Sequence, residues 1–242
     1  MPSLTSVTRD GIGLEVDEGA RSRGVVVAFS DRRGGVSTGP YESLNLALTV
    51  GDEHQAVLEN RRRVARAVGF DLYALGLVRQ VHGADLVRVG RREAGLLGEA
   101  DGLVTRHRGP VLGLLAADCA PVVLVGQGRL AVAHAGWRGL VAGVLEEAAT
   151  AVAPVWAAWV GPCIRRCCYE VSTDVVDAFR GRALPVADGT HVDIAGAARA
   201  ALGAAGVERV AVSRSCTGCD ERWFSHRRDG VTGRNGTFAT LV

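Results

Sequence analysis

The chain has 242 residues, of which 48% are hydrophobic and 22% are charged, so it can bury a substantial core. The formal net charge is only +2, no Lys is present, and the Arg residues are scattered among acids. This balance excludes a strongly basic surface, and we expect neither nucleic acid nor a membrane as a partner. No low-complexity tract or Pro-rich linker divides the sequence. We therefore predict a single domain over residues 1–242.

The amino-terminal segment lacks the basic stretch and apolar run of a secretory signal. The most apolar region, Val111 to Val125, is interrupted by Asp118 and Pro121 and is too short to span a bilayer. We expect a cytoplasmic protein, in which the six Cys residues are thiols or metal ligands rather than a disulfide framework. The sequence indicates no particular oligomeric state.

In chain order, the first half predicts a strand at Val25–Ser30 and then a helix. Asp52 is the predicted N-cap of this helix, its Val residues are spaced to form one apolar face, and Gly69 ends it. Apolar runs separated by turn residues then predict strands at 75–81, 84–89, 101–106, 111–116, 121–126 and 129–134.

The second half alternates helices with strands and shows no repeat of fixed period. It predicts a helix at 138–152, a strand at 155–160, helices at 173–179 and 193–206, and a strand at 207–213. Short strands mixed with a few helices favour an α+β fold, with mixed β-sheets flanked by helices in a single domain.

Three metal-binding residue types stand at the ends of predicted strands: His82, Cys119 and His134. Imidazole and thiolate are preferred zinc donors, and a catalytic zinc site has three protein ligands and one open position. The spacing between these residues is long, so the pattern alone is a weak metal signal, and a lone buried His is usually structural. Their sequence neighbours carry more information.

Those neighbours resemble the YfiH-like or laccase-domain proteins, which are also described as polyphenol-oxidase-like purine nucleoside phosphorylases. The resemblance covers nearly the whole chain. Its blocks, in order, are FSDRRGGVSTGPYESLNLALTVGDEHQAVLENRRRVARAVG, QVHGADLV, EADGLVT, AADCAPVVL, HAGWRGLVAGV, GPCIRRCCYEV, CTGC and WFSHRRDGVTGRNGTFATLV.

The resemblance implies that His82, Cys119 and His134 are the metal ligands, with Zn²⁺ as the expected ion and copper a possible one in vitro. It also implies phosphorolysis of adenosine, inosine and methylthioadenosine, together with deamination of adenosine. Purine nucleosides and phosphate are therefore the expected small-molecule partners. The fold that it implies has mixed sheets flanked by helices and is related to cysteine-hydrolase-like toxin domains.

Arg is the best side chain for phosphate, because its planar fork donates two parallel hydrogen bonds. Candidates in the matching blocks are Arg32, Arg138, Arg228 and Arg234, although each could equally be a solvated surface residue. Two further residues of these blocks, Asp118 and Asn45, are candidate catalytic residues. Asp118 could act as an acid or base, but a structural role beside Cys119 is favoured. Asn45 could contact substrate or satisfy a turn.

Trp137 could stack on a purine or pack in the core. The other cysteines also leave two interpretations open: a second, structural zinc site, or, for Cys168 and Cys216, small buried thiols packed beside the active site. These residues are Cys163, Cys167, Cys168, Cys216 and Cys219.

Other functions remain as alternatives. Two His and one Cys also form the ligand set of blue-copper centres. A multicopper oxidase, however, needs many His, and this chain has six His and no His-x-His pair. A cysteine hydrolase would use Cys119 as nucleophile and His134 as general base, which leaves His82 without a role. A non-enzymatic module would bind metal or nucleoside without turnover.

Overall fold

The strands form two sheets, both with parallel and antiparallel neighbours, in a computed structural model that describes residues 1–242. The larger sheet has the order β1-β2-β3-β13-β8-β4-β6 and the smaller one β12-β11-β9-β10-β7-β5. In the larger sheet the strands are β1 Thr5–Arg9, β2 Ile12–Val16, β3 Val25–Ser30, β13 Asn235–Leu241, β8 Val111–Ala116, β4 Leu75–Arg79 and β6 Gly95–Glu99. In the smaller sheet they are β12 Val210–Val212, β11 Val155–Val160, β9 Ala120–Gly126, β10 Arg129–Ala135, β7 Gly102–Thr105 and β5 Leu86–Arg88.

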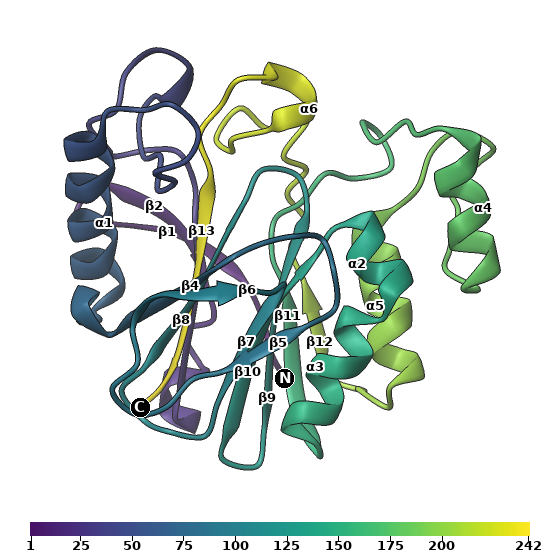
Figure 1. Ribbon diagram of the computed structural model, residues 1–242, viewed down its shortest axis with the longest axis horizontal. Coiled ribbons are helices and arrows are strands. Elements are labelled where there is room, and N and C mark those ends of the chain that lie inside the picture. Colours follow the sequence, from purple (N-terminus) through teal and green to yellow (C-terminus); the bar gives the residue numbers. More distant parts are fainter.

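The two sheets pack face to face, and helices cover their outer faces (Figure 1). Successive side chains of a strand point to opposite faces. In β9, Val123 and Val125 belong to the core between the sheets, whereas Val122 and Leu124 pack with the helices. In β3, Phe29 faces the same central core and Ala28 faces the other helix layer. The expected α+β arrangement of mixed sheets and helices is confirmed.

Six α-helices accompany the sheets. Figure 1 shows α1 on one side of the molecule and α2, α3, α4 and α5 on the other. Their bounds are α1 His54–Val68, α2 Trp137–Ala142, α3 Val144–Val152, α4 Thr173–Gly181, α5 Ile194–Ala204 and α6 His226–Asp229. No helix combines the length and the apolar character that crossing a membrane would require.

Two helix predictions need correction. The expected helix over 138–152 is two helices, α2 and α3, because Gly143 between them has φ +92°. This left-handed conformation is open to Gly and breaks a right-handed helix. The N-cap of α1 is Glu53, one residue beyond the predicted Asp52. Asp52 instead accepts hydrogen bonds from Ser37 Oγ and Asn45 Nδ2, at 2.6 and 2.9 Å.

The sequence patterns missed both ends of the larger sheet. The strands β1, β2, β6 and β13 were not predicted, although β13 lies in the middle of this sheet, between β3 and β8. Its sequence, NGTFATL, contains Gly and three polar residues, so it lacks a run of apolar residues. The pairing of β13 with β3 and β8, far away in sequence, supplies the stability that its local pattern does not.

Candidate active site

The pairing of β9 with β10 and the loop that follows β4 bring the predicted ligands together. Cys119 immediately precedes β9, and His134 lies near the end of β10 opposite Pro121. His82 lies in the loop that follows β4 of the other sheet. The site therefore forms at the ends of β9 and β10, where the loop from β4 to β5 crosses from one sheet to the other, and no short sequence motif spans it.

His82, Cys119 and His134 each direct one donor atom to a common point. The three donor atoms lie within 4.8 Å of one another, and Cys119 Sγ is 4.0 Å from His82 Nε2. His82 is exposed, Cys119 is half-buried and His134 is buried, so the group opens to solvent on one side. Two imidazoles and one thiolate with an open side fit a catalytic zinc site.

Asp101 supports this ligand group from behind, and the sequence patterns did not identify it. The backbone N–H of His134 donates to the carbonyl oxygen of Asp101, because Asp101 directly precedes β7, the strand that pairs with β10. Asp101 Oδ1 is 2.9 Å from His134 Nδ1, and the carboxylate accepts the backbone N–H groups of Val81, His82 and Gly83. A hydrogen bond at Nδ1 leaves Nε2 to bind a metal, as is usual for metal-ligating His.

Charge in this group favours the ionised thiolate. Burial raises the pKa of the Cys119 thiol, but His134 and His82 outweigh it and bring the pKa down to about 6. Burial also disfavours a charged His134, yet Cys119 and Asp101 raise its pKa to about 9. Without metal, the pair is therefore a thiolate beside an imidazolium. The thiolate is the form that binds zinc.

The backbone around the ligands has unusual geometry. His82 and Asp118 have φ values of +63° and +95°, which residues other than Gly rarely adopt. A Cβ on Gly136 would lie 2.9 Å from Cys119 Sγ and 3.1 Å from His82 Cδ2, so only Gly fits there. Strained residues persist where the surrounding structure holds them, and they cluster at functional sites.

Asp118 is buried, and its carboxylate is hydrogen-bonded to other groups of the protein. Its carboxylate accepts hydrogen bonds from Thr217 Oγ1 at 2.6 Å, Ser225 Oγ at 2.7 Å and the backbone N–H of Arg227 at 2.7 Å. Two separate segments of chain, at Thr217 and at the start of α6, are thus tied to the residue that precedes Cys119. These hydrogen bonds are all internal to the protein, and the positioning role favoured for Asp118 stays a prediction.

The four predicted Arg residues differ in their surroundings. Arg228 forms an ion pair with Asp229 at 2.7 Å and donates to the carbonyl oxygens of Thr217 and Trp223. Arg32 stacks on Phe224 at 4.7 Å and donates to a backbone oxygen. Neither guanidinium is directed at the ligand group by these contacts.

Arg234 and Arg138 have no carboxylate partner. Burial lowers the pKa of Arg234, while the charges of Asp118 and Cys119 act against that shift, so its guanidinium lies close to them. Arg234 donates only to the backbone oxygens of Thr232 and Gly233, at 2.8 and 3.0 Å. Arg138 is exposed and stacks on Trp137 at 4.5 Å.

The side chains of Asn45 and Trp137 make contacts within the protein. Asn45 is fully buried, and its side chain bonds to Ala47, to Asp52 and to the backbone N–H of Arg234. It therefore positions Arg234 from below the surface. Trp137 packs against the core of the smaller sheet, and Arg138 lies over its ring.

Tyr169 is a further residue that the sequence patterns missed. Burial raises its pKa to about 12, and the charges of Cys119, Asp118, Arg227 and Arg138 also act on it. The ring of Tyr169 lies 4.9 Å beneath the Arg227 guanidinium. Tyr169 stands in the quoted block GPCIRRCCYEV, but nothing in its local pattern distinguishes it from a core aromatic residue.

Comparison with known families identifies related proteins. A family described as multi-copper polyphenol oxidoreductase laccase matches residues 26–242. A protein named purine nucleoside phosphorylase YlmD, from Geobacillus stearothermophilus, is 38% identical over 87% of this chain and 88% of its own length. A protein named adenosine deaminase, from an unknown prokaryotic organism, is also 38% identical, over 93% of this chain and 98% of its own length.

Solved structures agree with these sequence matches. The crystal structure of YlmD from G. stearothermophilus matches with a TM-score of 0.89 at 34% identity, covering 100% of this chain and 99% of that one. The structure of the Bacillus licheniformis protein YfiH matches with a TM-score of 0.87 at 30% identity, covering 96% and 97%. The fold is therefore YfiH-like.

Proposed function

We propose that this chain, which belongs to the multi-copper polyphenol oxidoreductase laccase family, is a zinc-dependent purine nucleoside enzyme. The main reaction is phosphorolysis of adenosine, inosine or methylthioadenosine to the free base and ribose 1-phosphate or methylthioribose 1-phosphate. Adenosine deamination is a second activity. Relatives named purine nucleoside phosphorylase and adenosine deaminase support both parts.

One observation carries the proposal: an open group of three metal donors lies near the Arg234 guanidinium, which forms no ion pair with a carboxylate. His82, Cys119 and His134 would hold the ion, and zinc suits this mixture of imidazole and thiolate. When bound, the metal supplies a Lewis acid that can activate water or stabilise phosphate oxygens. The unpaired charges of Arg234 and Arg138 supply the binding energy for a phosphate dianion.

In phosphorolysis a phosphate oxygen forms a bond to C1′ of the ribose while the bond from C1′ to the purine nitrogen breaks. The departing purine needs a proton or a hydrogen bond. We assign phosphate orientation to Arg234 and Arg138, because each keeps donors that are free of carboxylates. Tyr169, whose pKa is raised to about 12 by burial and by nearby anions, stays protonated and can donate a hydrogen bond to substrate.

The other predicted residues take supporting roles in this proposal. Asp118 holds the main chain beside Cys119, and Asn45 holds the backbone of Arg234. Arg228 locks the loop that contains Thr217, and Arg32 remains a candidate at the rim of the site through its contact with Phe224. We also propose residues 1–242 as one domain, a cytoplasmic location, and a distant relation to cysteine-hydrolase-like domains.

Metal analysis and product chromatography test the function together. The purified protein is incubated with adenosine, inosine and methylthioadenosine, with and without phosphate. We expect free base only with phosphate, inosine from adenosine without it, and loss of both after zinc removal with recovery on zinc addition. Equal release of base without phosphate would show hydrolysis, and absence of all products would contradict the proposal.

The Cys119–His134–Asp101 arrangement also favours a second candidate, a cysteine hydrolase. Such an enzyme needs a thiolate, a base and a group that orients the base, and all three are present. The two candidates differ in their response to chelation: a hydrolase stays active without metal and is inactivated when Cys119 is alkylated. In a hydrolase His82 would only help His134 to lower the pKa of Cys119, whereas in the metal site it is a ligand.

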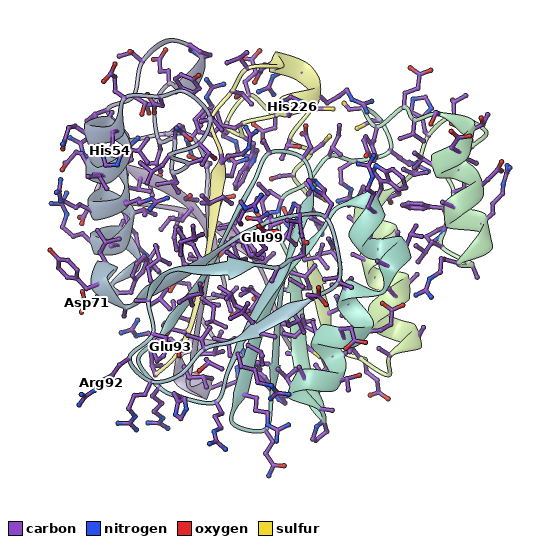
Figure 2. The ribbon with its side chains drawn as sticks, viewed as in Figure 1. His54, Asp71, Arg92, Glu93, Glu99 and His226 are labelled. Carbon is purple, nitrogen blue, oxygen red and sulfur yellow. The ribbon has the colours of Figure 1, made fainter.

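Phenol oxidation is less well supported by the donor set. Only two of the six His residues, His82 and His134, belong to a group that could hold a metal. Figure 2 shows His54 on α1 and His226 on α6, on separate elements. A multinuclear copper cluster built from many His has no place among these residues.

A further inference from the structure

A second group of metal-binding residues lies apart from the first and shares no residue with it. It consists of the thiols of Cys167, Cys168, Cys216 and Cys219, whose sulfur atoms all lie within 4.8 Å of one another. Sγ of Cys219 is 3.4 Å from Sγ of Cys167 and 3.1 Å from Sγ of Cys168. Sγ of Cys167 is 3.5 Å from that of Cys216. All the cysteines are free thiols.

The fold brings these thiols together through two parallel strands. The strands β11 and β12 are parallel neighbours, and the loops that leave them run side by side as far as a bridge between Cys163 and Cys216. The first loop then turns at Arg165, whose carbonyl oxygen accepts a hydrogen bond from the N–H of Cys168. The second turns at Cys216, whose carbonyl oxygen accepts from the N–H of Cys219. Each turn presents two sulfurs.

The local packing leaves little freedom to these turns. A Cβ on Gly218 would lie 2.7 Å from Cys168 Cβ and 3.0 Å from its Sγ, so the two loops touch at a point where only Gly fits. The backbone N–H of Arg165 donates to Cys216 Sγ at 3.3 Å. An N–H donor aimed at a sulfur stabilises the thiolate form.

The separations suit one tetrahedral ion. Zn–S bonds of about 2.3 Å place the sulfurs of a tetrahedral site about 3.8 Å apart. The separations of 3.1, 3.4 and 3.5 Å are shorter by about 0.7, 0.4 and 0.3 Å, which small rotamer changes can absorb. We propose that Cys167, Cys168, Cys216 and Cys219 bind a second zinc ion in a closed, structural site. Four soft sulfur donors with no open position favour zinc and a structural role.

The ion can reach this site from solvent. Cys167 and Cys219 are exposed, and Cys216 and Cys219 line a surface cavity of about 760 Å³ that also includes Ser3 and Arg214. The site thus has an entry path, which a metal site requires in addition to its ligands.

The proposed second zinc site is linked to the first site through Thr217 and Asp118. Thr217 lies between two of the proposed ligands and donates to Asp118 Oδ1 at 2.6 Å, next to Cys119. The guanidinium of Arg228 holds the carbonyl oxygen of Thr217 at 2.8 Å. Loss of the second zinc would therefore free the loop that fixes Asp118, while the ligands of the first site would remain in place.

Metal counting tests the proposal independently of any enzymatic activity. The protein is purified under reducing conditions and reconstituted with zinc. We expect about two zinc ions per chain, about one in Cys219→Ser, about one in His82→Ala, and about none when both changes are combined. The matched control is Cys163→Ser, a buried cysteine outside both groups, which should keep both ions.

A spectroscopic measurement on the unmutated protein and on His82→Ala covers the case in which Cys219→Ser fails to fold. Cobalt is added in place of zinc, and the intense sulfur-to-cobalt absorption of the unmutated protein should persist in His82→Ala, which empties the first site. Cys167→Ser should weaken that absorption as Cys219→Ser does. The melting temperature of the unmutated protein should fall by about 5 °C or more when the second ion is removed.

Three results would overturn the proposal. The first is a single zinc that His82→Ala removes and Cys219→Ser leaves. The second is a disulfide among the four cysteines, found by mass spectrometry of the reduced and reconstituted protein. The third is iron rather than zinc in this site after reconstitution with both metals.

Discussion

The two cysteine-containing groups of this protein are built in opposite ways. Three donors from both sheets form the first group, which is open to solvent, hydrogen-bonded to the Asp101 carboxylate and close to Arg234, which has no carboxylate partner. Four sulfurs from two adjacent loops form the second group, which leaves no open position. Open coordination leaves room for a substrate, whereas closed coordination holds chain segments together. The same residue type thus serves two purposes that its surroundings decide.

Breaking the first group should have the largest effect. Cys119→Ser replaces a thiolate by a hydroxyl that stays protonated near neutral pH and binds zinc poorly. We expect loss of one zinc and a fall in nucleoside turnover of more than about 100-fold, with an unchanged circular dichroism spectrum. Cys163→Ser is the control. Normal zinc content together with normal turnover in Cys119→Ser would place the active site elsewhere.

Asp101→Asn should weaken zinc binding by the first group, because it alters the hydrogen bond to the ligand His134. The carboxylate that orients His134 and accepts three backbone N–H groups becomes an amide, whose NH₂ would oppose one of these donors. We expect zinc to bind about 10–100-fold more weakly, measured by competition with a chelator. Asp188→Asn removes a comparable contact, to His191, outside both groups and should leave zinc affinity unchanged. Equal affinities in both variants would contradict a role for Asp101.

The phosphate contacts separate substrate binding from metal binding. Arg234→Gln and Arg138→Ala should each raise the KM for phosphate by about 10-fold or more and leave zinc content unchanged, because a charged hydrogen bond contributes about 1.5–3 kcal/mol. Arg228→Gln breaks an internal ion pair with Asp229 and should lower the melting temperature instead. An unchanged KM for phosphate in the first two variants would show that these guanidiniums are structural.

Thr217→Val should have the smallest effect, because it cuts only the link between the two groups. Its hydroxyl donates to the buried Asp118 carboxylate, so we expect a loss of about 1.5–3 kcal/mol in the free energy of unfolding and a modest fall in turnover. Both zinc ions should stay bound. Thr232→Val is the matched control, since the buried Thr232 hydroxyl has no partner and should be lost at little cost. Equal destabilisation by both changes would contradict the link.

Local patterns predicted the elements whose stability is local or whose faces are apolar. The Val residues of α1 form one face, and the apolar runs of β8, β9 and β10 were recognised as strands. The split between α2 and α3 depends on the φ of Gly143. The central strand β13 was missed because its mixed sequence becomes a strand only between β3 and β8. A local sequence pattern cannot predict the stability that a strand gains from pairing with distant strands.

By itself, the sequence determined the family, the α+β class and the identity of His82, Cys119 and His134 as ligand candidates, because residue type and block order carry that information. Only the tertiary structure decided that Asp101 supports His134, that Arg228 is neutralised while Arg234 is not, and that four separate cysteines share one point. These facts depend on which side chains meet across strand registers and loops. Distance and burial, which set the hydrogen bonds and the charges of a site, exist only in the folded chain.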